Sequence, residues 1–179
     1  MPLHPLGSAH LARLLAMAAL SPPCRILDMG AGKGESLGRL LDLGFDAVGI
    51  DLRAEGAVSA GDFLHCPFPA ASFDAVLSEC AFFVSGDVRG ALREAARLVR
   101  PGGKLLLGDV CFLCLHEWEA LLGDTGFRLL QAEDQSAAWK QYYLESIWEG
   151  RDIGSGSFPK GKCRYYLTVC ERRNTDGTL

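Results

Sequence analysis

The residues best suited to chemistry form one glycine-rich segment near the amino terminus. Positions 26–34 read ILDMGAGKG, in which an apolar run ends at Asp28 and glycines follow at alternate positions, Gly30, Gly32 and Gly34. A second apolar run, 48–50, ends at Asp51. Glycines let a backbone turn sharply, and a helix that begins behind them offers unpaired N–H groups. Because an acid at the tip of the second strand can bind two ribose hydroxyls, the pattern predicts a nucleoside site.

The glycine spacing distinguishes between two kinds of nucleoside ligand. Dinucleotide sites use G-x-G-x-x-G, which leaves room for a pyrophosphate, whereas this chain has G-x-G-x-G. A carboxylate at Asp28 would repel a pyrophosphate and attract an ammonium group. The spacing therefore favours a cationic ligand without phosphate. The alternative is that the glycines only form turns between structural elements and bind no ligand.

These residues need a parallel sheet to position them, and the chain alternates strand and helix patterns as such a sheet requires. Helices are predicted at 8–20, 34–43, 88–98, 116–122 and 136–148. Strands are predicted at 25–29, 47–51, 57–60, 73–79, 104–109, 127–132 and 163–171, with a tight turn at 100–103. We expect an α/β, Rossmann-like, doubly wound sheet with helices on both faces. The third strand must be short, because too few residues follow Asp51 for a full crossover helix.

Composition narrows the class of protein. A chain of 179 residues with 49% hydrophobic and 22% charged residues predicts a single soluble domain, 1–179. A net charge of −4 argues against a nucleic-acid partner. No apolar run reaches the roughly 18 residues of a membrane span. The regularly spaced arginines 89, 93, 97 and 100 are interpreted as a solvated helix face.

Seven cysteines, an odd number, predict reduced thiols in a cytoplasmic protein, since we find no secretion signal. Cys111 and Cys114 form a C-x-x-C, and His116 could add a third metal ligand. A zinc site needs four ligands, so we interpret these cysteines as small buried residues and expect no metal.

Three further segments carry a family resemblance. They are GDF at 61–63, FPAASFDAV at 68–76 and LREAARLVRPGGKL at 92–105. Together with the glycine loop, these segments resemble class I S-adenosylmethionine-dependent methyltransferases of the type 11 kind, strongly over 24–109 and weakly beyond. The resemblance implies a seven-stranded, mostly parallel sheet whose last strand is antiparallel. It implies S-adenosylmethionine as cofactor, bound by Asp28, Gly30, Ala31, Gly32, Gly34, Asp51, Leu52, Asp62, Phe63 and Glu79. Asp62 would accept from the adenine amino group; its alternative role is a turn or helix cap.

The implied reaction is methyl transfer to a small-molecule acceptor by in-line displacement. Such a reaction depends mainly on alignment, so no obligatory catalytic residue is predicted. Weak candidates are Glu79, His116, Tyr142 and Tyr143, for which surface or packing roles are the alternatives. Clustered cysteines are also used by methyltransferases that act on metalloids such as arsenite, but the cysteine spacing of this chain does not clearly match such a set.

Two regions would choose the acceptor. One is residues 4–7, within the amino-terminal helical segment 1–22, which would fold over the cofactor. The other is the insertion 133–162, which places an aromatic helix and a Gly-Ser loop before the last strand. The insertion is typical of a mobile lid over a substrate, and equally of a dimer surface. Two other functions stay open: a non-catalytic nucleoside-binding or assembly subunit, and a nicotinamide oxidoreductase, which the glycine spacing disfavours.

Overall fold

The computed structural model describes residues 8–53, 55–150 and 162–174, and it contains one seven-stranded sheet in the order β3-β2-β1-β4-β5-β7-β6. All neighbouring strands are parallel except β7, which is antiparallel to both β5 and β6. The predicted Rossmann-like fold with an antiparallel last strand is therefore confirmed. Across these residues, no helix combines the length and apolar character that crossing a bilayer requires.

The elements follow the predicted order. The strands are β1 (Arg25–Met29), β2 (Asp46–Asp51), β3 (Val58–Ala60), β4 (Phe73–Glu79), β5 (Val99–Cys111), β6 (Phe127–Asp134) and β7 (Arg164–Arg172). The helices are α1 (Ser8–Ala18), α2 (Glu35–Asp42), α3 (Phe82–Ser85), α4 (Val88–Leu98), α5 (Leu115–Asp124) and α6 (Ser136–Trp148), with a 3₁₀ turn η1 (Phe63–His65). As predicted, β3 is short, and the described residues between β2 and β3 form no crossover helix.

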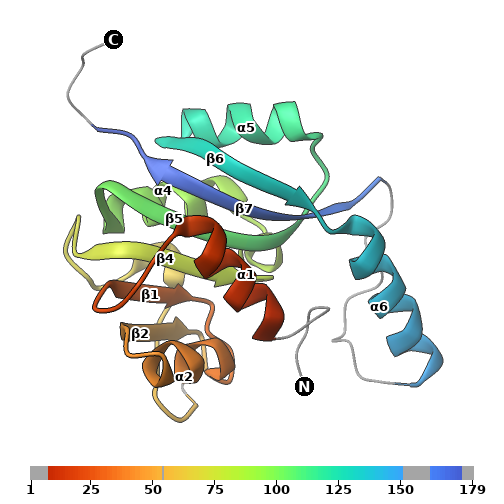
Figure 1. Cartoon of the computed structure of the whole chain (residues 1–179), viewed down its shortest axis with the longest axis horizontal. Helices are drawn as coiled ribbons and strands as arrows, with labels where there is room; N and C mark the ends of the chain where they lie inside the picture. The colour runs from red at the N-terminus through yellow and green to blue at the C-terminus, as the bar shows by residue number, and fades with distance from the viewer. Residues whose placement is uncertain (1–7, 54, 151–161, 175–179) are drawn as a thin grey trace.

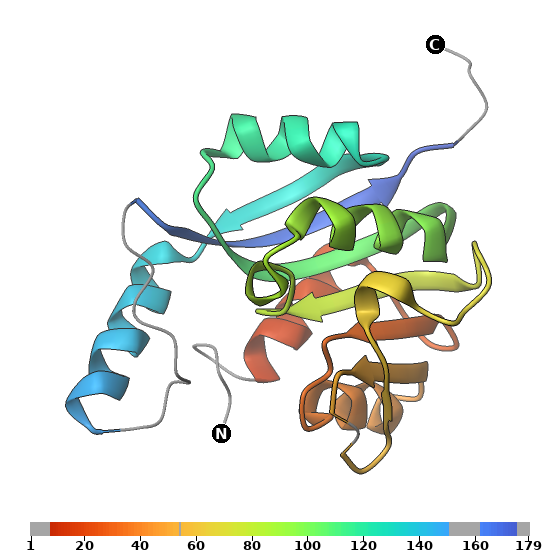
Figure 2. The ribbon, with the colours of Figure 1, turned by 180° about the vertical axis from the view of Figure 1, so that it is seen from behind.

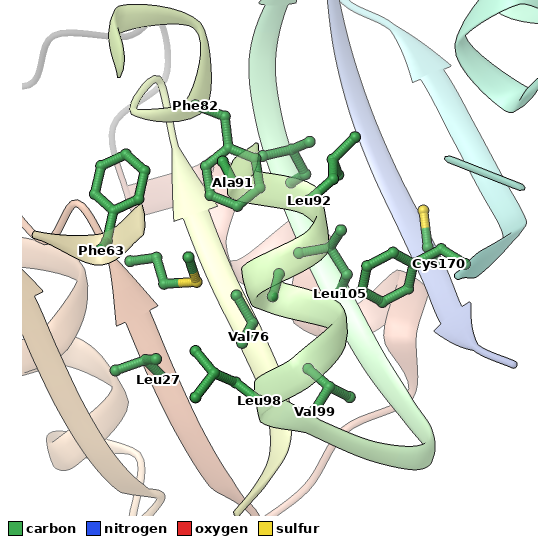
Figure 3. Packing of buried hydrophobic residues seen from close by; sticks show 14 of the residues in the cluster. Leu27, Phe63, Val76, Phe82, Ala91, Leu92, Leu98, Val99, Leu105 and Cys170 are labelled. Carbon is green, nitrogen blue, oxygen red and sulfur yellow. The ribbon is translucent and has the colours of Figure 1, made fainter. Parts of the chain in front are cut away.

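Helices cover both faces of the sheet, with α1 in front of it in Figure 1 and α4 in front in the reverse view of Figure 2. On the α4 and α5 face, Leu92, Leu98 and Trp118 pack against strand residues such as Val76. Figure 3 shows part of this cluster, including Val76 under α4. On the other face, α1 packs its apolar side onto β5 and β7. The sheet is thus buried on both sides, which explains its nearly continuous apolar strands.

Two local features differ from the sequence-based expectation. The predicted tight turn at 100–103 lies inside β5, as a bulge: Phe73 pairs with Val99 and Ala75 already pairs with Lys104. Gly102 takes a positive φ of 75° there, which glycine adopts without strain. The short helix α3 and the turn η1 were not predicted, because each is too brief to show helical periodicity.

The carboxyl ends of the parallel strands share one edge of the sheet. Because β6 runs parallel to β5, α6 begins at this same edge, and in Figure 1 it lies on the side to which the β4 and β6 arrowheads point. The glycine loop follows β1 at this edge as well. Ligands of open α/β sheets bind at this edge.

Candidate functional site

The glycine loop connects β1 to α2 and is held against β2 by the backbone. The amides of Gly30 and Ala31 both donate to the carbonyl oxygen of Ile50, at 2.9 and 3.1 Å. Gly34 precedes the first turn of α2 with a φ of 82°, and its amide donates to the carbonyl of Ala31. The loop therefore places the amino terminus of α2 at the carboxyl edge, and the first N–H groups of a helix have no partner inside the helix.

Gly30 and Gly32 have positive φ angles but different surroundings. A Cβ atom on Gly30 would lie 2.2 Å from the Cβ of Ala81, so this glycine lets the loop pass close to the end of β4. A Cβ atom on Gly32 would meet nothing within 4 Å. The loop is thus packed tightly on one side and open on the other, where a ligand can approach the backbone.

Asp51 ends β2 and is half-buried beside the loop. Its Oδ2 accepts from the Gly32 amide at 2.9 Å and its Oδ1 from the Arg53 amide at 3.2 Å. These bonds fix the carboxylate at the tip of the strand, where each oxygen has lone pairs left for a ligand. Leu52, the next residue, is largely exposed.

Asp28 is the most unusual charged group of the site. It is buried at 2% exposure, and its Oδ2 meets no hydrogen-bond partner within the described part of the chain. Burial, together with the nearby carboxylates of Glu79 and Asp51, raises its pKa from 3.8 to about 8. A buried acid among other acids is a place where a cation would bind favourably.

Glu79 ends β4 next to the loop, where the resemblance places it. Its Oε2 accepts from the hydroxyl of Ser36 at 2.5 Å, which ties the end of β4 to the first turn of α2. Glu79 acts on the pKa of Asp28, so the two carboxylates lie close together. The structure therefore brings Asp28, Asp51 and Glu79 to one place.

Asp62 and Phe63 lie at the start of η1. Asp62 caps this turn, since its Oδ1 accepts from the Leu64 amide at 2.9 Å, and that bond lowers the pKa of the carboxyl. The Asp62 side chain is otherwise exposed, whereas Phe63 is buried and stacks on Phe82 at 5.8 Å between ring centroids. The ring of Phe63 also lies beside Gly30, so η1 borders the glycine loop.

The remaining catalytic candidates are more scattered. His116 is exposed in the first turn of α5. Tyr142 and Tyr143 are half-buried on α6, and the Tyr143 ring packs against Trp139 at 5.7 Å. Of the four candidates, only Glu79 lies among the site carboxylates.

Sequence reasoning missed two groups at the ends of β4 and β5. Asp109 is 5% exposed, and its carboxylate accepts from the amides of Phe83 at 3.0 Å and Val110 at 2.7 Å. Burial raises its pKa to about 7, while these amides act in the opposite direction. The sequence feature that could have indicated Asp109 is its position at the end of the strand predicted at 104–109.

The second missed group is Cys80, which follows Glu79 with a φ of 57°. Left-handed backbone is unfavourable for a residue with a side chain and clusters at functional sites. Its amide donates to the Gly108 carbonyl at 2.8 Å, and its thiol donates to the Tyr165 hydroxyl at 3.6 Å. These contacts hold the end of β4 in a conformation that periodicity alone does not reveal.

The cysteines do not gather into a metal site. The described part of the chain has no cluster of three or more cysteine, histidine or acidic residues arranged to hold a metal ion. Cys111 is buried at the end of β5, whereas Cys114 is exposed, and its amide donates to the Glu117 carboxylate at the start of α5. The interpretation of the pair as small buried residues is thus right for Cys111 and wrong for Cys114.

The predicted arginine face is also partly corrected. Arg97 is not merely solvated: its guanidinium donates to Glu94 and to the carbonyls of Cys66 and Phe68. Arg100 pairs with Asp74 at 2.5 Å. These arginines hold loops and strand ends rather than forming an open cationic surface.

Comparison with known proteins agrees with this geometry. Residues 27–107 match the family model described as "Methyltransferase domain". Demethylmenaquinone methyltransferase of Beutenbergia cavernae is 35% identical over 131 residues, which cover 66% of this chain and 55% of that protein. The uncharacterized methyltransferase YodH of Bacillus subtilis is 30% identical over 165 residues, or 72% of this chain and 70% of that protein.

A solved structure is similar in fold. Phosphoethanolamine N-methyltransferase 2 of Haemonchus contortus, in complex with S-adenosyl-L-methionine, superimposes with a TM-score of 0.75 at 18% identity, over 96% of this chain and 54% of that chain. The chain spans about half the length of the first curated relatives it matches. On the matched domain, the similarity to YodH and the strand order, this chain belongs to the class I S-adenosylmethionine-dependent methyltransferase family.

Proposed function

We propose that this protein binds S-adenosylmethionine at the glycine loop and transfers its methyl group to a small-molecule acceptor. The observation that carries the proposal is the convergence of Asp28, Asp51 and Glu79 beside an open glycine backbone. A phosphate-bearing cofactor would be disfavoured by this group of acids, whereas a sulfonium with an ammonium group would be attracted and would favour the ionised form of Asp28. The relatives are themselves named as methyltransferases, and several are named for small-molecule substrates.

The residues present fit this cofactor. The Oδ2 of Asp28 is buried and lacks a partner among the described residues, so an ammonium group there would satisfy it. Asp51 is fixed at the strand tip in reach of ribose hydroxyls, and Gly32 leaves the loop open above its backbone. The loop residues Ala31 and Gly34, with Leu52, Asp62 and Phe63 around them, complete the proposed cofactor site.

The chain's own contribution to the reaction is chiefly binding and alignment. When bound, S-adenosylmethionine supplies a methyl group that its sulfonium already activates for displacement. Asp28 and Glu79 favour positive charge at the end of β1 and β4, and the bond from Ser36 keeps Glu79 in place. A closed site would exclude water and hold the acceptor in line. We assign no general base.

We also propose that 1–179 acts as a single domain in which α6 covers the acceptor. Its first turns are anchored, because Trp139 is buried and stacks on Tyr165 at 6.2 Å. Its last turns expose Leu144, Ile147 and Trp148, an apolar surface at the carboxyl edge. The Gly-Ser loop of the predicted lid lies outside the described residues except for Lys162.

The cofactor proposal is tested by calorimetry with S-adenosylmethionine, S-adenosylhomocysteine and NAD. We expect the first two to bind and NAD not to bind. Asp51→Ala should lower S-adenosylhomocysteine affinity by about tenfold or more, since a ligand hydroxyl bonded to a carboxylate contributes roughly 1.5–3 kcal/mol. Asp46→Ala is the matched control, because Asp46 begins the same strand at its opposite end.

Two results would contradict the proposal: S-adenosylhomocysteine fails to bind, or Asp51→Ala binds it as well as the unaltered protein does. Turnover of a labelled methyl donor against a panel of metabolites separates an enzyme from a non-catalytic binding subunit. Binding without turnover on any acceptor would favour the second function.

A further inference from the structure

A hollow that the cofactor site does not use lies between α3, the end of β5 and α5. Its volume is about 260 Å³, slightly below the roughly 300 Å³ at which typical small-molecule sites begin. None of the residues that line it is charged, and most are apolar. They include Phe83, Val88, Val110, Phe112, Leu113 and Trp118. A hollow of this size and lining suits one compact apolar molecule.

Asp109 holds two walls of this hollow together. Its carboxylate accepts from the amide of Phe83 in α3 and from the amide of Val110 in β5. The rings of Phe83 and Phe112 then meet across the two segments, with centroids 5.6 Å apart. Two segments far apart in the sequence are therefore fixed around the hollow by a buried carboxylate.

The hollow lies next to the proposed cofactor site. The glycine loop touches Ala81, since a Cβ on Gly30 would overlap the Cβ of that residue. Only Phe82 separates Ala81 from Phe83, the wall of the hollow, and Phe82 stacks on Phe63 beside the loop. Figure 3 shows Phe63 and Phe82 lying side by side above the strand ends. The turn after β4 thus has the glycine loop on one side and the hollow on the other.

The surface around the hollow is apolar as well. Val84 in α3 is 77% exposed, Phe112 in the segment that joins β5 to α5 is 46% exposed, and Leu115 at the start of α5 is 43% exposed. Within the described residues, the buried indole N–H of Trp118 meets no hydrogen-bond acceptor. An unpaired buried donor lowers the stability of the fold, so tryptophan is an unfavourable residue for a wall whose only role is packing.

We propose that this hollow binds the apolar body of the methyl acceptor, which is therefore a compact, largely apolar compound rather than a small charged metabolite. The inference rests on the proposed function, because it takes the neighbouring site to be the cofactor site. Asp109 is then a positioning residue that sets the distance between the walls. Substitutions that fill the hollow weaken acceptor binding and leave cofactor binding unchanged.

The test uses 2-naphthol, a neutral two-ring compound, as the probe on the full chain with S-adenosylhomocysteine present. Its affinity is measured by saturation-transfer NMR titration. Leu113→Phe and Leu121→Phe each add bulk to a wall of the hollow. Leu130→Phe is the matched control, because Leu130 is exposed on β6 and does not line the hollow. Circular dichroism shows that each variant is folded, and calorimetry measures its affinity for S-adenosylhomocysteine.

We expect 2-naphthol to bind, and each filling variant to weaken it by about tenfold or more, as overpacking predicts. The control and all S-adenosylhomocysteine affinities should stay unchanged. The inference is overturned if 2-naphthol does not bind, or if it binds the filling variants as tightly as the control. If 2-naphthol binds only the unfilled hollow while S-adenosylhomocysteine binds no form, the proposed function fails and the hollow remains a site for apolar rings without a methyl donor beside it.

Discussion

The pH dependence of cofactor binding tests the central electrostatic feature of the site. Asp28 has a pKa raised from 3.8 to about 8, so at neutral pH it is mostly protonated in the ligand-free protein. An ammonium group placed at its buried carboxyl favours the ionised form. Binding therefore drives a proton off Asp28, and affinity must rise as the pH rises toward 8.

The size of the effect follows from the pKa. At pH 6 about one Asp28 side chain in a hundred is ionised, and at pH 8 about half are. If the ligand binds only the ionised form, its affinity increases by about fifty-fold over these two pH units. At pH 7, where about nine in ten are protonated, roughly 0.9 proton is released for each ligand bound.

The assay is calorimetric titration of S-adenosylhomocysteine between pH 6 and pH 8. Repeating it at pH 7 in two buffers of different ionisation enthalpy counts the released protons directly. Asp28→Asn keeps the shape of the side chain and cannot titrate, so its affinity should be weak and independent of pH. The reasoning is refuted if the unaltered protein binds equally well at pH 6 and pH 8, or if Asp28→Asn keeps the slope.

Two further predictions concern stability, and urea unfolding measures both. Gly30→Ala should lower the free energy of unfolding by about 2–4 kcal/mol, because it adds a Cβ clash with Ala81 to left-handed strain. Gly32→Ala, which has the strain without the clash, should cost only about 1 kcal/mol; equal losses would contradict this account. Arg97→Ala should cost about 2 kcal/mol after allowance for its partial exposure, since it removes bonds to two loop carbonyls. Arg89→Ala, whose exposed pair is 3.5 Å long, should cost under about 0.5 kcal/mol, and a similar loss in both would count against the role of Arg97.

Most of the fold was predictable because its elements are locally encoded. The bounds of β1, β4, α4 and α6 agree with the sequence pattern, and the glycine loop joins β1 to α2 as predicted. The exceptions depend on distant partners. The segment 100–103 has the residues of a turn, but pairing of Phe73 and Ala75 on either side keeps it within β5.

The positions of the candidate site residues in the fold were predictable to the same extent. Asp28 and Asp51 are recognisable because they end apolar runs beside glycines. The bond from Ser36 to Glu79 joins residues 43 positions apart, and the role of Asp109 depends on where α3 packs. Such contacts follow from the register of the assembled sheet, which a local pattern does not contain. Asp62 shows the same dependence on assembled structure, since its side chain caps η1 by accepting from the Leu64 amide.

The insertion of β7 between β5 and β6 has a consequence for how the molecule is made. Residues 164–171 supply the hydrogen-bonding partners of β5 and also bind β6, so each of those strands has an open edge until they arrive. The ribosome synthesises this segment after the other strands of the sheet. The nascent chain therefore carries two unpaired, partly apolar edges late in synthesis, and exposed edges of this kind invite aggregation.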